Sequence, residues 1–275
     1  MKLSVHSVTC SRPILNKRGC MRVLSLFSGG GLGDYGLTLA GMEIVGQVEI
    51  DDYCQKILKL RWPEVPKWRD IRDVKGSEVL EKCGRIDLIS GGFPCQDISY
   101  ANAKAEGISG RRSGLWSEMF RIVCEIRPKY VLVENVSALL ERGIGVVLGD
   151  LASIGFDAEW DCVRSSSLGN IHRRERVFIL AYPHSEGLQR RQIISQDKEM
   201  HSRFMERFGR EKQLEGLVQS TLRTAIPTRT GSGVHDGITQ RVDKLRMCGN
   251  GQDVRVIRWI GKRIMEFDNT TNTGE

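Results

Sequence analysis

The chain has 275 residues, of which 40% are apolar, and this is enough for one full α/β domain and a smaller module. The 41 Lys and Arg against 34 Asp and Glu give a net charge of +7, which suits a polyanionic partner without identifying one. No apolar run approaches the roughly 20 residues of a membrane-spanning helix, and the N-terminus lacks a long secretory hydrophobic stretch. The composition therefore excludes a membrane protein, and we expect a cytoplasmic location.

The first 20 residues are mixed polar and show no sustained periodicity, whereas an apolar strand follows directly after Met21. We hypothesise that residues 1–20 are a dispensable leader and that Met21 is an alternative or the true start. The competing interpretation is an ordered N-terminal arm.

From residue 23 onward, short β-rich runs alternate with helical stretches. Strands are predicted at residues 23–27, 44–50, 86–90, 130–134, 156–163 and 177–181, and helices at residues 34–41, 51–61, 113–126 and 144–153. This order predicts a Rossmann-like α/β fold with a mostly parallel sheet. The short link between the last two strands favours an antiparallel pair at one sheet edge.

After Pro183 the composition becomes polar, Arg-rich and β-poor, and this continues to about Gly237. An apolar stripe at residues 255–260 and 264–265 then predicts a final helix that packs back on the first domain. We therefore divide the chain into a leader (1–20), a main domain (21–183), a short second domain (184–236), a returning helical region (237–268) and a tail (269–275).

The eight cysteines are scattered, without a Cys-x-x-Cys pair or a histidine spacing typical of zinc. We expect most of them to be reduced, buried side chains and predict no metal site.

A glycine-rich turn between the first strand and the first helix indicates a cofactor site, because glycines let a ligand approach the backbone. Glu49 ends the next strand about 20 residues on, where a carboxylate can bind both hydroxyls of a ribose. Asp70 and Ile71 follow at positions suited to an adenine ring, although Asp70 alone would be interpreted as a helix cap. At this point a dinucleotide oxidoreductase fits as well as any other nucleoside-binding enzyme.

The strand at residues 86–90 runs directly into Gly91-Gly92-Phe93-Pro94-Cys95, so the Cys95 thiol is predicted at the sheet edge where α/β proteins bind ligands. Another apolar strand ends in Glu134-Asn135 at the same edge. A nucleophile and a proton source are thus predicted side by side.

These motifs, with their order and spacing, resemble the cytosine-5 DNA methyltransferase family of class I S-adenosylmethionine-dependent methyltransferases. The similar segments are the 27–33 turn, Pro94-Cys95-Gln96, Glu134-Asn135-Val136, the Arg174 and Arg176 motif, and Gly249-Asn250. The resemblance covers residues 21–183 and 237–265. Two departures are His172 in place of glutamine and Gly251-Gln252-Asp253 in place of small and aliphatic residues.

The resemblance implies that the Cys95 thiolate adds to carbon 6 of a flipped cytosine, and that carbon 5 then accepts the methyl group of S-adenosylmethionine. Glu134 would bind N3 and the exocyclic amine, and Asn135 and Pro94 would help to position the reactants. Arg174 and Arg176 would hold the base oxygen or neighbouring carboxylates. The implied cofactor contacts are Phe27, Ser28, Gly29, Gly31, Gly33, Glu49, Ile50, Asp70, Ile71, Gly91, Pro94 and Asn250.

Double-stranded DNA is the partner that the resemblance implies, with residues 184–236 in the place of the target-recognition domain. The implied DNA contacts are Gln96, Ser99, Lys104, Arg111, Arg112, Arg190 and Arg191. We expect a monomer that accompanies a cognate restriction endonuclease. The alternatives are a tRNA cytosine-5 methyltransferase, although its Cys-Phe-Thr motif is missing from this sequence, and a catalytically silent DNA-binding relic, against which Cys95, Glu134 and Arg176 argue.

Overall fold

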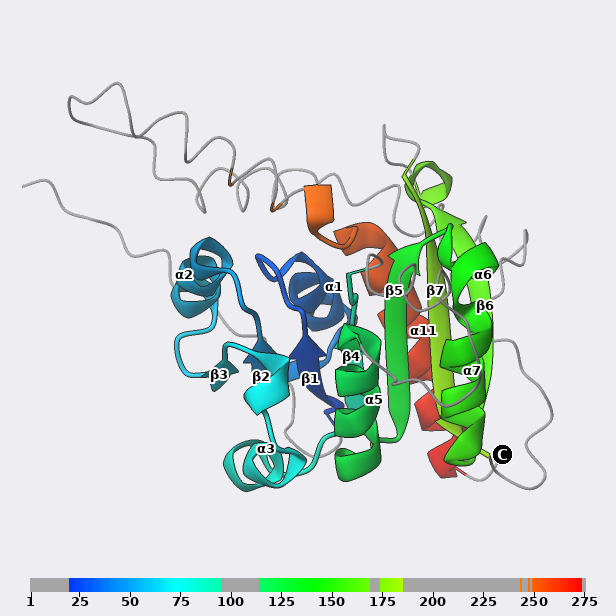
Figure 1. Cartoon of the computed structure of the whole chain (residues 1–275), viewed down its shortest axis with the longest axis horizontal. Helices are drawn as coiled ribbons and strands as arrows, with labels where there is room; N and C mark the ends of the chain where they lie inside the picture. The colour runs from blue at the N-terminus through cyan, green and yellow to red at the C-terminus, as the bar shows by residue number, and fades with distance from the viewer. Residues whose placement is uncertain are drawn as a thin grey trace, which may run out of the picture.

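The computed structural model describes residues 20–94, 114–168, 174–184, 243, 247 and 249–273. Within these residues, one seven-stranded sheet has the order β3-β2-β1-β4-β5-β7-β6. The strands are β1 (Arg22–Leu26), β2 (Glu43–Val48), β3 (Lys67–Trp68), β4 (Leu88–Gly91), β5 (Tyr130–Val136), β6 (Phe156–Arg164) and β7 (Glu175–Pro183). Figure 1 shows the strands side by side across the molecule, from β3 on the left to β6 on the right.

Five strands of the sheet, from β3 to β5, pair in parallel. Strand β7 pairs antiparallel with both β5 and β6. The predicted Rossmann-like fold with a mostly parallel sheet and an antiparallel edge pair is therefore confirmed. Because β7 runs opposite to β5, its first residues lie beside the last residues of β5.

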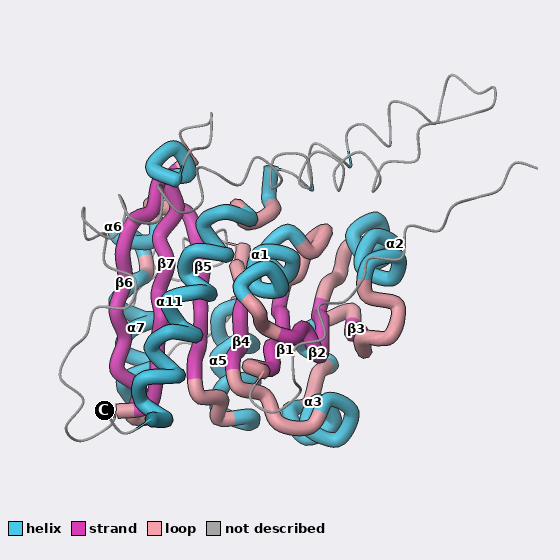
Figure 2. The backbone as a smooth tube through the Cα atoms, turned by 180° about the vertical axis from the view of Figure 1, so that it is seen from behind, coloured by secondary structure: helices cyan, strands magenta, loops and turns pink. Residues whose placement is uncertain are grey.

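Helices cover both faces of the sheet. Their bounds are α1 (Leu32–Ala40), α2 (Asp52–Arg61), α3 (Gly76–Cys83), α5 (Leu115–Ile126), α6 (Leu139–Arg142), α7 (Ile144–Ser153) and α11 (Val254–Thr273), with short 3-10 turns η1 (Ile71–Asp73) and η2 (Ser165–Leu168). In Figure 1, α5 and α7 lie in front of the sheet, whereas Figure 2, from behind, shows α1 and α11 on the opposite face.

Two apolar clusters fill the layers between the sheet and these helices. The first joins the sheet to α3, α5 and α7, with Ile89, Val131 and Ile122 fully buried. The second joins the other face to α1 and α11 and includes Ile257 and Ile260. Helix α11 is thus the predicted final helix, and its apolar stripe faces the sheet.

Helix α11 approaches α1 closely because glycines lie at their contact. A Cβ on Gly36 would lie 2.8 Å from the carbonyl oxygen of Val254, and one on Gly261 would lie 2.7 Å from Cβ of Ala40. None of the helices in the described ranges is long and apolar enough to cross a membrane. None of the described cysteines forms a disulfide; Cys54 and Cys83 are buried, and Cys20, Cys124 and Cys162 are partly buried.

Candidate functional site

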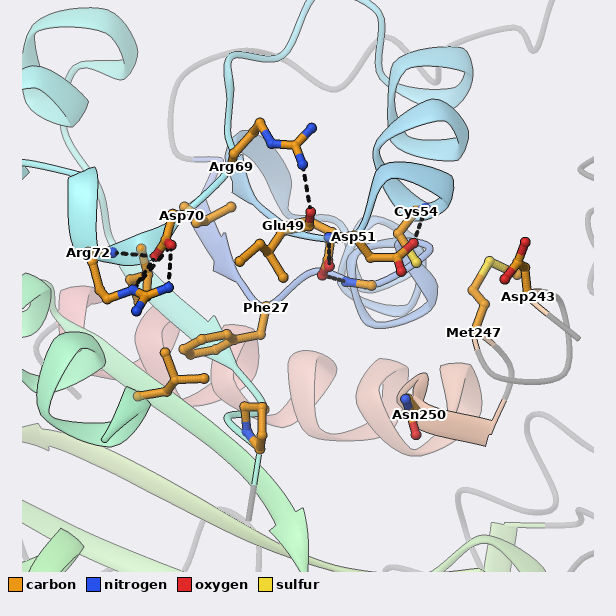
Figure 3. Close-up of a pocket in the computed structure, with 17 residues that line it drawn as sticks. Phe27, Glu49, Asp51, Cys54, Arg69, Asp70, Arg72, Asp243, Met247 and Asn250 are labelled. Atoms are coloured by element: carbon orange, nitrogen blue, oxygen red, sulfur yellow. Dashed lines mark hydrogen bonds and ion pairs between the residues drawn. The ribbon is translucent and has the colours of Figure 1, made fainter. Parts of the chain in front are cut away.

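A cavity of about 300 Å³ opens where β1, β2 and β4 end, at the carboxyl edge of the parallel strands. Figure 3 shows Asp70 and Arg72 at one end of it and Met247 and Asn250 at the other, with Phe27 between them. This volume is at the lower limit for small-molecule sites. The sequence predicted a ligand site at this edge.

The glycine-rich turn forms one wall of the cavity through Phe27 and Gly29. Phe27 has φ 55°, a left-handed conformation that is unfavourable for a side chain other than glycine. Gly29 also has φ 55°, and a Cβ placed on it would meet nothing within 4 Å. The backbone at Gly29 therefore leaves open space beside the cavity.

Glu49 is fixed beside this turn by two backbone donors. Its Oε2 accepts a hydrogen bond from Gly29 N at 2.7 Å, and its Oε1 accepts one from Asp51 N at 2.8 Å. Burial raises the pKa of the Glu49 carboxyl, and these backbone hydrogen bonds oppose the rise. Each oxygen retains a lone pair, so the carboxylate can accept further hydrogen bonds from a diol.

The opposite end combines acidic and apolar side chains. Asp70 caps η1 by accepting from Arg72 N, and its carboxylate pairs with the Arg72 guanidinium at 2.6 Å. The hydrogen bonds from Arg72 lower the pKa of Asp70. Ile71 is buried, whereas Ile50 is 57% exposed although it lines the cavity. An aromatic ring bound here would cover Ile50.

Among the predicted cofactor residues, the structure brings eight to the cavity wall: Phe27, Gly29, Glu49, Ile50, Asp70, Ile71, Pro94 and Asn250. The other four do not line it. Ser28 is in the turn, Gly31 has the Trp62 ring in the place of a side chain, and Gly91 contacts β1. A Cβ on Gly33, in α1, would lie 1.8 Å from Oε1 of Gln252, one of the residues that depart from the family pattern. The Gln252 side chain therefore fills the space next to Gly33.

Sequence reasoning missed several residues of this wall. Asp51 caps α2 by accepting from Cys54 N at 2.9 Å, and Leu115 begins α5. Met247 lies over the turn, because a Cβ on Gly30 would be 2.3 Å from its sulfur. Asp51, next to Glu49, was detectable as a helix cap; the other two reach the wall from separate segments.

The predicted acidic group, Glu134, is buried at the end of β5, with a side chain that is 8% exposed. Its Oε1 lies 3.2 Å from Nε of Arg176 and 3.9 Å from Nη2 of Arg174. The Arg176 contact is an ion pair, and within the described residues the buried Oε1 meets no donor in full hydrogen-bond geometry. Burial raises the pKa of Glu134, and the two guanidinium groups oppose that rise.

The antiparallel pairing of β5 and β7 creates this arrangement, since Val136 is the register partner of Arg176. Arg174 is held in turn by a hydrogen bond from its Nη1 to the carbonyl oxygen of Gly249 at 2.8 Å. Strand order therefore explains why Arg174 and Arg176, distant in sequence from Glu134, meet it.

The segment before the predicted nucleophile lies against Glu134. Asn135 Nδ2 donates to the carbonyl oxygen of Phe93 at 3.0 Å, and a Cβ on Gly92 would lie 2.8 Å from Oε2 of Glu134. Gly92 and Pro94 also line the cavity. The carboxyl group and the cavity thus share one wall. Cys95, Gln96, Ser99, Lys104, Arg111, Arg112, Arg190 and Arg191 lie outside the described residues.

The chain is similar to known cytosine-specific DNA methylases along most of its length. The family model for C-5 cytosine-specific DNA methylase matches residues 21–225. Type II methyltransferase M2.BsuMI of Bacillus subtilis is 35% identical over 169 residues, which are 58% of this chain and 42% of that protein. Type II methyltransferase M.NgoPII of Neisseria gonorrhoeae is 35% identical over 167 residues, 59% of this chain and 48% of that one.

The solved structure of a Spodoptera frugiperda DNMT2 mutant supports the fold. It has a TM-score of 0.62 and 16% identity and covers 89% of this chain and 99% of its own. The chain spans less than half the length of the two Type II relatives.

Proposed function

Because the chain belongs to the C-5 cytosine-specific DNA methylase family, we propose that it transfers a methyl group from S-adenosylmethionine to carbon 5 of a flipped cytosine in a short DNA sequence. The observation that carries this proposal is the shared wall. Gly92 lies between the cavity and the buried Glu134 carboxyl, so a methyl donor in the cavity would lie next to a base held by Glu134.

The cavity residues fit the proposed cofactor. Glu49 offers a carboxylate for the ribose hydroxyls, and Ile50 and Ile71 offer apolar surface for the adenine ring. Asp70 would accept from the adenine amine, and the open space at Gly29 admits a ligand close to the backbone. When bound, S-adenosylmethionine supplies an electrophilic methyl group attached to a sulfonium.

The proposed chemistry begins at Cys95. Its thiolate forms a bond to carbon 6 of cytosine, and the electron pair of the 5,6 double bond becomes available at carbon 5. Carbon 5 takes the methyl group as the bond between that group and the sulfonium sulfur breaks, which leaves a neutral thioether. Transfer of the carbon 5 proton to a water molecule then restores the double bond and expels the Cys95 thiolate, so the enzyme is regenerated.

Glu134 assists the addition as a neutral carboxyl that donates to N3 of the base. Burial raises its pKa and so favours this form, as in other sites that keep an acid protonated. Arg176 and Arg174 limit the rise and orient the carboxyl through Oε1. Asn135 fixes Phe93, two residues before the nucleophile.

The family and its Type II relatives suggest the remaining features of the proposal. The substrate is double-stranded DNA, and the base is flipped because the target carbon is inaccessible in the stack. The Arg-rich segment 184–236 reads the sequence. The protein acts as a monomer in the cytoplasm, beside a cognate restriction endonuclease.

Expression in bacteria without cytosine methylation, followed by bisulfite sequencing of their DNA, tests the activity and reveals the recognition sequence. We expect one short methylated context with the wild type and none with Cys95→Ser. A duplex with 5-fluorocytosine should trap the wild type covalently and leave Cys95→Ser free. Methyl transfer to tRNA instead of duplex DNA, or DNA binding without release of S-adenosylhomocysteine, would contradict the proposal.

A further inference from the structure

A buried acidic side chain, Asp34, lies behind the cavity wall and takes no part in the chemistry above. It is in the first turn of α1 and is 2% exposed. Ser25 Oγ donates to its Oδ1 at 2.5 Å, and Gln47 Nε2 donates to its Oδ2 at 2.6 Å. Within the described part of the chain, no cation lies at ion-pair distance from this carboxylate.

The hydrogen bonds continue from Asp34 to the glycine-rich turn. Ser28 Oγ lies 2.9 Å from Ser25 Oγ and 3.1 Å from the carbonyl oxygen of Ser25. Each hydroxyl has one hydrogen. When Asp34 is ionised, the Ser25 hydrogen points to the carboxylate, so Ser25 Oγ accepts the hydrogen of Ser28. The charge therefore gives the chain one direction, from Ser28 through Ser25 to Asp34.

Protonation of Asp34 reverses the donor–acceptor direction of these hydrogen bonds. Because Gln47 donates to Oδ2, the added proton is placed on Oδ1 and is donated to Ser25 Oγ. The Ser25 hydrogen then turns towards Ser28 and displaces the hydrogen that Ser28 directed at it. The Ser28 hydrogen then turns to the carbonyl oxygen of Ser25, 3.1 Å away. The chain keeps its hydrogen bonds, but they are no longer strengthened by the charge of Asp34.

The hydrogen-bond chain ends at Ser28, which lies between two cavity residues in the sequence. Phe27 and Gly29 line the cavity on either side of Ser28, and both have φ 55°. Ser28 N also donates to the carbonyl oxygen of Val48 at 3.0 Å. Because Phe27 has an unfavourable left-handed backbone, its conformation depends on such anchors.

The charged surroundings favour titration in an accessible range. Burial raises the pKa of Asp34 to about 6, while the hydrogen bonds from Ser25 on β1 and Gln47 on β2 lower it. Glu49, which follows β2, raises it further, and Lys67 on β3 lowers it. On α1 itself, Thr38 donates to the backbone oxygen of Asp34.

We propose that ionised Asp34 is a positioning residue which holds the glycine-rich turn in its cofactor-binding shape, so that its protonation weakens the binding of S-adenosylmethionine. This inference rests on the proposed function, because it takes S-adenosylmethionine as the ligand. Asp34 acts through Ser25 and Ser28 and does not touch the ligand.

The test is calorimetric titration of the full chain with S-adenosylmethionine between pH 5 and pH 8, together with the variants Asp34→Asn and Ser25→Ala. The matched control is Asp87→Asn, since Asp87 is also a buried acid and accepts from Arg22 N at the other end of the sheet. Circular dichroism at each pH verifies that every variant is folded.

For the wild type we expect affinity to fall below pH 6 by about tenfold in total, because protonation removes the charge assistance from the hydrogen-bond chain without breaking it. Asp34→Asn should bind S-adenosylmethionine more weakly at pH 8, and its affinity should no longer depend on pH. Ser25→Ala should show the same two changes although it retains the Asp34 carboxyl. The control should keep the wild-type profile. An Asp34→Asn variant with the wild-type profile would assign the titration to another group, such as Glu49, and overturn the inference.

Failure of the proposed function gives a different result. A wild type that binds no S-adenosylmethionine at any pH overturns both proposals, whereas binding with constant affinity from pH 5 to pH 8 overturns only the role of Asp34. If Asp34→Asn does not fold, Ser25→Ala decides, because an unchanged profile in that variant shows that the turn does not depend on the chain.

Discussion

Replacement of Gly92 by alanine should displace the carboxyl group of Glu134. The added Cβ would lie 2.8 Å from Oε2 of Glu134, whereas ordinary contact begins at 3.4 Å, so one of the two groups must move by about 0.6 Å. Misplacement of a catalytic group by 1 Å can cost about 100-fold in rate. Under the proposed function, we therefore expect kcat for methyl transfer to fall about 10- to 100-fold.

The assay is transfer of a tritiated methyl group to duplex DNA, with the affinity for S-adenosylmethionine measured separately. Gly149→Ala in α7 is the matched control, because its Cβ would meet nothing within 4 Å. It should keep wild-type activity and raise the free energy of unfolding by about 1 kcal/mol through helix propensity. An undiminished kcat in Gly92→Ala would refute the reasoning, as would a loss of activity matched by an equal loss of cofactor affinity.

Two further predictions concern the Glu134–Arg176 pair and the packing of α11. Arg176→Gln removes a cation that lowers the pKa of Glu134, so under the proposed function the alkaline limb of the kcat profile should move to higher pH. A limb that stays in place or moves down would contradict this. Gly36→Ala would put a Cβ 2.8 Å from the carbonyl oxygen of Val254 and should lower the free energy of unfolding in urea by about 1–3 kcal/mol. An increase, as helix propensity alone predicts, would show that α1 and α11 separate easily.

The parallel part of the fold was predictable because its strands are continuous apolar runs with turn signals between them. The position of β7 between β5 and β6 was not, since it depends on pairing between distant segments. Helix α3 was missed because it is only eight residues long, although Val79 and Cys83 have helical spacing and are buried.

The residues of the candidate site were also predictable only in part. Glu49 and Asp70 follow strands directly, so the sequence places them at the correct sheet edge. Asp34 could not be found this way, because its partners Ser25 and Gln47 become neighbours only through the pairing of β1 and β2. Gln252 reaches Gly33 through the return of α11, which sequence spacing does not specify.

That return has a consequence for synthesis on the ribosome. About 70 residues separate the end of β7 from the start of α11, and their translation takes about 4–14 s at 5–20 residues per second. During this interval the apolar face formed by Val23, Leu132 and Phe178 lacks the helix that buries it. The nascent chain should therefore be prone to aggregation and dependent on chaperones until α11 emerges.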